Sequence, residues 1–203
     1  MTGRWRLLGL PAAALVLVGV VLGVQLAHGG GTFEPLRSAD PCAARAVTTR
    51  ATGIDGLTER LVLLGIDAAA CRLHVSREEL TLDLAAAARP SDAQVSALRH
   101  GLLDAVARMK KDGTLPKASA LLDEALGQMG LNPLLEAAIR ALPDGVVDAA
   151  LKTDDVLDRT IDKLDLRTLL TDLDDSDGLE QQVREAVTSA IQDSLKDRVR
   201  HLL

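Results

Sequence analysis

Aromatic residues are nearly absent from this chain of 203 residues. It has no tyrosine, and its single tryptophan (Trp5) and single phenylalanine (Phe33) both precede Glu34. Sites for sugars, single-stranded nucleic acids and quaternary ammonium ions usually place the ligand against aromatic rings. The composition therefore argues against these ligand classes for residues 34–203 and predicts an aliphatic core.

Positive charge is also scarce. The chain has 23 basic and 29 acidic residues, and every acidic residue lies at or beyond Glu34. Without Arg4 and Arg6, the 21 basic residues that remain face 29 acidic ones, which gives a net charge of −8. An acidic domain has no general attraction for phosphate backbones, so we expect no nucleic acid partner.

The common catalytic and metal-binding motifs are missing too. The sequence has no HExxH, no GxSxG, no Walker A loop and no GxGxxG. The aspartates before Gly178 suggest a calcium loop, but Leu173 and Arg184 occupy the first and last ligand positions of that pattern. We therefore expect that the protein is not an enzyme and that it binds no cofactor and no metal.

One long apolar run is present near the N-terminus. The run from Leu7 to Ala27 is 21 residues long and carries no charge. About this number of apolar residues spans a bilayer core. Arg4 and Arg6 precede the run, and the next basic residue is Arg37. The positive-inside rule then puts the N-terminus in the cytoplasm. The predicted organisation is a cytoplasmic tail (1–6), a transmembrane signal anchor (7–28), a linker (29–40) and an extracytoplasmic α-helical domain (41–203).

Two features of this run leave alternatives open. Ala27-His28-Gly29 would also suit signal peptidase, in which case the domain is secreted rather than anchored. Gly19 and Gly23, with Ala27 four residues later, form a GxxxG pattern. Small residues at this spacing favour close pairing of transmembrane helices, which predicts a homodimer; glycine is also simply common in such helices.

Cys42 and Cys71 are the only cysteines. Export would place them in an oxidising compartment, where a single structural disulfide is expected. Closing a loop of about 30 residues stabilises a fold by about 3–4 kcal/mol on the chain-entropy model. The bridge is predicted to join the first two helices of the exported domain.

Leucine and alanine, both strong helix formers, supply a third of the chain. Apolar residues recur at spacings of three and four, and no segment alternates as a strand would. The prediction is an all-α domain of about seven to nine helices, with chain breaks at Gly53 and Gly56. The expected helices cover 42–50, 57–73, 76–88, 91–111, 117–129, 132–142, 146–151, 154–173 and 179–202.

Several segments also resemble known proteins. Residues 39–42 (ADPC), 65–71 (GIDAAAC), 76–80 (SREEL) and 151–157 (LKTDDVL), together with the basic N-terminus and single anchor, resemble single-pass membrane proteins of unknown function from high-GC actinobacteria. This resemblance implies a location in the membrane but no activity. The leading hypothesis is a non-catalytic interaction or scaffold domain of the cell envelope, with a protein partner or a homodimer. The alternatives are a carrier or sensor of an apolar, lipid-like ligand and an unrecognised hydrolase.

Overall fold

The computed structural model describes residues 17–28, 40–43, 45–87, 89–129, 132–172 and 175–202. The chain divides into two units, Met1–Ser38 and Ala39–Leu203. Within the first unit, residues 17–27 form a helix on which Leu17, Val21 and Leu26 are more than half exposed. The predicted tail, the first ten residues of the predicted anchor and the linker residues 29–39 lie outside the described residues.

None of the described helices is both long enough and apolar enough to cross a membrane.

The second unit consists of helices and connecting segments throughout its described part. Its helices are α2 (Gly53–Leu73), α3 (Arg77–Ala86), α4 (Asp92–Lys111), α5 (Ala118–Met129), α6 (Pro133–Arg140), α7 (Asp144–Ala150), α8 (Thr153–Lys163), α9 (Leu166–Thr171) and α10 (Ser176–Leu202). This confirms the predicted all-α class.

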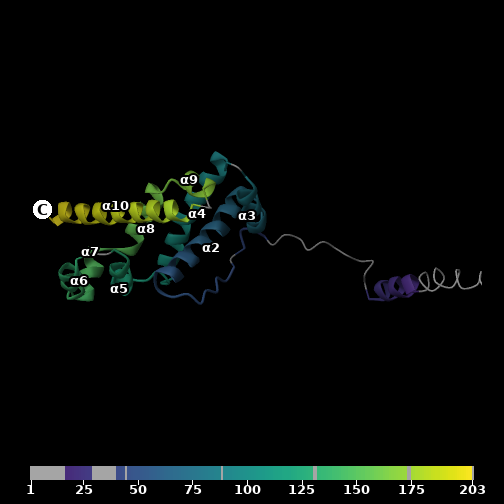
Figure 1. Ribbon diagram of the computed structural model, residues 1–203, viewed down its shortest axis with the longest axis horizontal. Helices are drawn as coiled ribbons and strands as arrows, with labels where there is room; N and C mark the ends of the chain where they lie inside the picture. Colours follow the sequence, from purple (N-terminus) through teal and green to yellow (C-terminus); the bar gives the residue numbers. More distant parts are fainter. Residues whose placement is uncertain are drawn as a thin grey trace, which may run out of the picture. The chain divides into compact units, whose positions relative to one another are not determined.

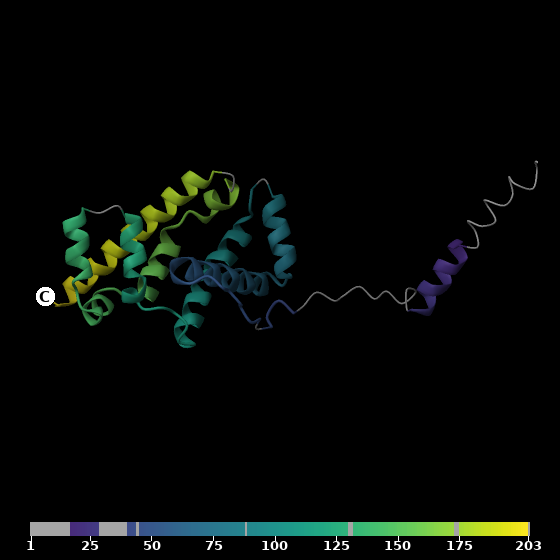
Figure 2. The same ribbon diagram turned by 60° about the horizontal axis from the view of Figure 1, so that its bottom comes forward.

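A close crossing of α2 and α4 forms the centre of this unit (Figures 1 and 2). The contact is made by small residues, with Gly65 and Ala69 on α2 meeting Gly101 on α4, and all three are buried. A Cβ at Gly101 would overlap the Gly65 carbonyl oxygen and would lie 2.8 Å from the Ala69 backbone nitrogen. The two backbones can approach this closely only because neither glycine has a side chain.

Two aliphatic clusters extend from this crossing. The larger one joins α2 and α4 to α3, α8 and α9; its buried members include Leu80, Leu84, Leu98, Ile161 and Leu166. The smaller one lies between α2 and α4 and contains Leu57, Leu64, Ala105 and Met109. Both are aliphatic, as the lack of aromatic residues requires.

Several helix ends are capped by side chains from other helices. Arg99 of α4 donates to the carbonyl oxygens of Asp162 (3.0 Å) and Leu164 (2.7 Å) at the end of α8. Glu124 of α5 accepts from the backbone N–H of Ile54 in the first turn of α2, at 2.8 Å. A cation at a helix C-terminus and an anion at an N-terminus also complement the helix dipole. These bonds fix the relative positions of neighbouring helices.

The N-terminal part of the unit differs from the prediction. Described residues 45–52 contain no helix, so the expected helix over 42–50 is wrong. Gly53 does lie at a boundary, because the non-helical segment ends there and α2 begins with a φ of +64°, but the expected break at Gly56 is wrong, since Gly56 lies inside α2. A Cβ at Gly56 would overlap the backbone carbonyl of Ala51, so this glycine serves a close approach inside the helix.

The single helix expected over 154–173 is also wrong, because α8 ends at Lys163 and α9 begins at Leu166. The Asp165 carboxylate accepts from the backbone N–H groups of Arg167 (3.1 Å) and Thr168 (3.2 Å). An aspartate in this position starts a new helix. The second helix therefore turns away and brings Leu166 into the larger cluster.

The α2–α4 crossing generates a stability prediction. Gly101→Ala should destabilise the protein by about 1–3 kcal/mol, because the added methyl group meets backbone atoms that cannot move aside. Gly127→Ala on α5 is the matched control, since no atom lies within 4 Å of a Cβ built there. It should stabilise by up to about 1 kcal/mol through helix propensity. Urea unfolding followed by circular dichroism measures both, and equal effects would contradict the crossing.

Candidate functional site

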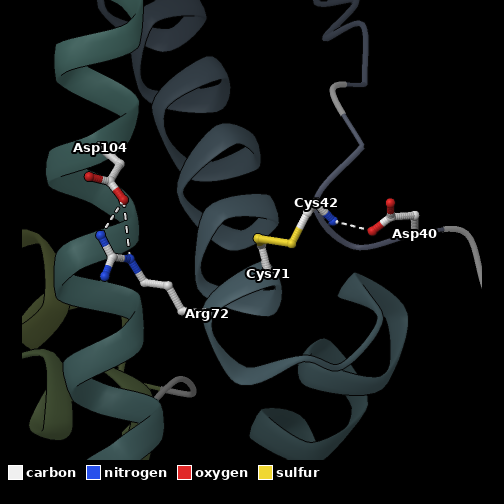
Figure 3. Close-up of a disulfide and its surroundings, with 5 residues drawn as sticks. All are labelled: Asp40, Cys42, Cys71, Arg72 and Asp104. Carbon is white, nitrogen blue, oxygen red and sulfur yellow. Dashed lines mark hydrogen bonds and ion pairs between the residues drawn. A yellow bond between two sulfur atoms is a disulfide. The ribbon is translucent and has the colours of Figure 1, made fainter.

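The predicted disulfide is present in a different setting from the one expected. Cys42 and Cys71 are bonded, with Cα atoms 4.7 Å apart. Figure 3 shows that the bond joins the non-helical segment containing Cys42 to the last turn of α2, rather than joining two helices. The Cys42 N–H donates to the Asp40 carboxylate at 2.9 Å, which holds the turn at the start of the segment.

A hollow of about 260 Å³ lies beside the disulfide, lined by residues of this segment, α2 and α4. Its charged residues have opposite charges close by. Arg45 pairs with Glu78 at 3.1 Å, and Asp104 accepts two bonds from Arg72, the shorter at 2.6 Å (Figure 3). These pairs hold α2, α3, α4 and the segment together, so we assign the hollow a structural role.

Asp154, Asp155, Asp158 and Asp162 lie on α8, and grouped carboxylates can serve acid–base chemistry or bind a metal. Asp154 and Asp155 contact other helices instead, Asp154 through Lys110 of α4. Asp155 accepts from the Ser194 hydroxyl of α10 at 2.6 Å and pairs with Arg159 at 3.0 Å. Arg159 also pairs with Asp197 of α10 at 2.8 Å. In the described part of the chain, no three side chains of the metal-binding types come together.

The pKa values on α8 follow from these contacts. Burial raises the pKa of Asp155, but the Ser194 hydroxyl and Arg159 lower it more, so its net pKa is below the usual range. Asp158 has the opposite shift. Burial raises its pKa, and the neighbouring carboxylates Asp154, Asp162 and Asp155 raise it further. Asp158 is thus the carboxylate on this helix whose charge works against folding.

In the second unit, the most prominent exposed apolar residues lie on α6, on α7 and between them. Leu134 is 81% exposed, and Ala137, Ala138 and Ala141 are exposed with it at the i, i+3, i+4 and i+7 positions. Leu142 and Val146 are 45% and 50% exposed. We call these six residues the α6–α7 surface. Apolar residues at this spacing normally face a core, so this face has the pattern of a contact surface.

The position of α6 explains why its outer face is open. It packs on α5, and it lies at one end of the unit in both views (Figures 1 and 2). Asn132 caps its first turn by accepting from the Leu134 N–H at 2.9 Å, with Pro133 in the first helical position. This cap holds Leu134 in helical geometry at the exposed start of the helix.

Acidic side chains lie on α5, α6 and α7 as well, and most of them have a partner of their own. Asp123 of α5 is 86% exposed and lies 3.3 Å from Arg140, which also pairs with Glu136 at 2.7 Å. Asp144 is exposed at the start of α7. Asp148 accepts from the Ser119 N–H, and this bond, assisted by Lys117, lowers its pKa and keeps it ionised.

The predicted transmembrane contact residues Gly19, Gly23 and Ala27 all lie in the helix of residues 17–27. A Cβ at either glycine would meet no atom within 4 Å. The pairing of two such helices stays a prediction. The α6–α7 surface was missed from sequence, because its i, i+3, i+4, i+7 pattern is the same pattern that marks a buried face.

No protein-family model, no curated protein and no solved structure matches the chain.

Replacing both cysteines (Cys42→Ser with Cys71→Ser) should lower the free energy of unfolding by about 3–4 kcal/mol, since the unfolded chain loses its cross-link. Residues 45–52 should also become sensitive to protease, because the disulfide is one of few bonds that hold this non-helical segment. Urea unfolding and limited proteolysis measure the two effects. Unchanged stability, or free thiols in wild-type protein purified without reductant, would contradict the disulfide.

Asp158→Asn should stabilise the protein at pH 7, by less than about 1 kcal/mol because the side chain is partly exposed. The raised folded-state pKa means that the carboxylate costs stability above its unfolded pKa of about 3.9. The gain should therefore vanish at about pH 3, where the wild-type group is protonated in both states. Asp155→Asn is the control with the opposite sign and should destabilise at pH 7. Thermal melts at both pH values test the pair, and a destabilising Asp158→Asn would refute the assignment.

Proposed function

We propose that this chain is a membrane-anchored protein of the cell envelope, whose helical domain binds another protein and performs no catalysis. Residues 7–28 would be the anchor, with Arg4 and Arg6 on the cytoplasmic side and residues 41–203 outside. The apolar length of the segment and its charge asymmetry support this topology. The Cys42–Cys71 disulfide fits the oxidising compartment that the topology requires.

The single observation that carries the binding role is the exposed α6–α7 surface. An apolar helix face that includes a leucine 81% exposed costs free energy in water, and covering it with a partner recovers that cost. The carrier hypothesis calls instead for an enclosed apolar cavity. The hollow beside the disulfide is lined by charged residues such as Arg45, Asp67 and Asp104, so we do not favour that alternative.

Photo-crosslinking in intact membranes tests the proposal. A photoreactive amino acid would replace Leu134 on the α6–α7 surface, or Leu82 on α3, which is 69% exposed and serves as the matched control. We expect a reproducible protein adduct from position 134 and no such adduct from position 82. The adduct should be lost from a variant that lacks residues 1–28. The absence of any protein adduct from exposed positions on the domain would overturn the binding role.

A further inference from the structure

We infer that the Cys42–Cys71 disulfide is a reducible clasp. Its reduction by an external dithiol would release residues 45–52, which we call the strap, and would uncover the smaller aliphatic cluster while the larger one stays folded. Two observations carry this inference: the disulfide is accessible, and the strap beside it has few other contacts. Neither the α6–α7 surface nor the proposed binding role enters into it.

The disulfide can be reached from solution. Cys42 is exposed and Cys71 is half-buried. Figure 3 shows Cys42 on the non-helical segment that runs outside α2. The hollow of about 260 Å³ beside the bond, lined by Pro41 and Ala43 as well as by both cysteines, leaves room for an approaching thiol. Since thiol–disulfide exchange depends on access to a sulfur atom, attack falls on Cys42.

The exchange takes place in two steps. A thiolate of the dithiol forms a bond with the sulfur of Cys42, the bond between Cys42 and Cys71 breaks, and Cys71 leaves as a thiolate that takes up a proton. The second thiol of the reagent loses its proton, forms the reagent's internal disulfide and releases Cys42 as a thiolate. The dithiol is thus oxidised by two electrons, and the protein disulfide is reduced by two.

The strap is held by few contacts besides the disulfide. Residues 45–51 make no backbone–backbone hydrogen bond with another described residue. Arg45 pairs with the exposed Glu78 at 3.1 Å, and the Thr49 hydroxyl donates to Glu59 at the surface. Exposed ion pairs contribute little to stability, whereas each ordered residue loses backbone entropy. Opening the disulfide therefore removes a restraint that these contacts do not replace.

The strap covers one aliphatic cluster and not the other. Val47 packs against the smaller cluster of Leu57, Leu64, Ala105 and Met109. Among the described members of the larger cluster there is no strap residue, because its buried side chains come from α2, α3, α4, α8 and α9. Release of the strap should therefore expose the smaller cluster and leave the larger one closed.

Methionine footprinting of the full chain tests the inference. Met109, which is 1% exposed, reports on the smaller cluster. Leu84→Met places a second reporter of similar volume in the larger cluster. This variant, purified in a mild detergent, would be treated with dithiothreitol or left oxidised, alkylated with iodoacetamide, desalted and exposed briefly to hydrogen peroxide. Mass spectrometry then measures the oxidation at each of the two positions.

We expect dithiothreitol to reduce the disulfide in native buffer, while circular dichroism still shows a folded helical domain. Oxidation of Met109 should become about tenfold faster, and the increase should be at least about fivefold larger than the increase at position 84. Cys42→Ser with Cys71→Ser, made in the same Leu84→Met background, is the matched control. Its Met109 should already react quickly, and dithiothreitol should change nothing.

Three results would overturn the inference. The first is a disulfide that dithiothreitol reduces only after urea has unfolded the protein. The second is an oxidation rate of Met109 that reduction leaves unchanged. The third is an equal increase at Met109 and position 84, which would show that reduction weakens the whole domain instead of releasing the strap.

Discussion

The close contact of Gly65 and Gly101 is the constraint on which the rest of the domain depends. It brings α2 and α4 together along Gly65 and Ala69 on one side and Ala97, Gly101 and Ala105 on the other. Small residues spaced four apart leave a smooth strip on each helix, so main-chain atoms pack directly against each other. A chain without large aromatic side chains gains its packing density in this way, by bringing backbones close instead of filling space with rings.

The other helices are then attached to this pair by polar bonds between elements as well as by leucine packing. Arg99 on α4 holds the end of α8, Glu124 on α5 holds the start of α2, and the Ser194 hydroxyl bonds to Asp155 to join α10 to α8. Each bond satisfies a group that packing would otherwise leave without a partner. Many charged residues in the described part of the domain take part in bonds of this kind.

Helix periodicity predicted the architecture well where local signals were strong. The expected helix 91–111 matches α4, whose start is held by a capping box of Ser91 and Gln94, and the expected helix 132–142 matches α6, which Asn132 caps. The errors have different causes. The break between α8 and α9 comes from a local cap, because the Asp165 carboxylate accepts from the N–H groups of Arg167 and Thr168. Gly56 is a breaker by local propensity, but it lies inside α2, where the backbone of Ala51 lies close to it. The exposed face of α6 depends on contacts distant in sequence, since apolar spacing alone does not separate the inward and outward faces of a helix.

Native-state hydrogen exchange of the full chain, read by mass spectrometry, tests the central claim most directly, namely that the α2–α4 pair supports the domain while α6 remains open. Exchange protection reports the free energy of opening for each segment. The account predicts the slowest exchange in α2 around Gly65 and α4 around Gly101, and markedly faster exchange in α6. Equal protection of α6 and α4, or rapid exchange around Gly65 and Gly101, would contradict it.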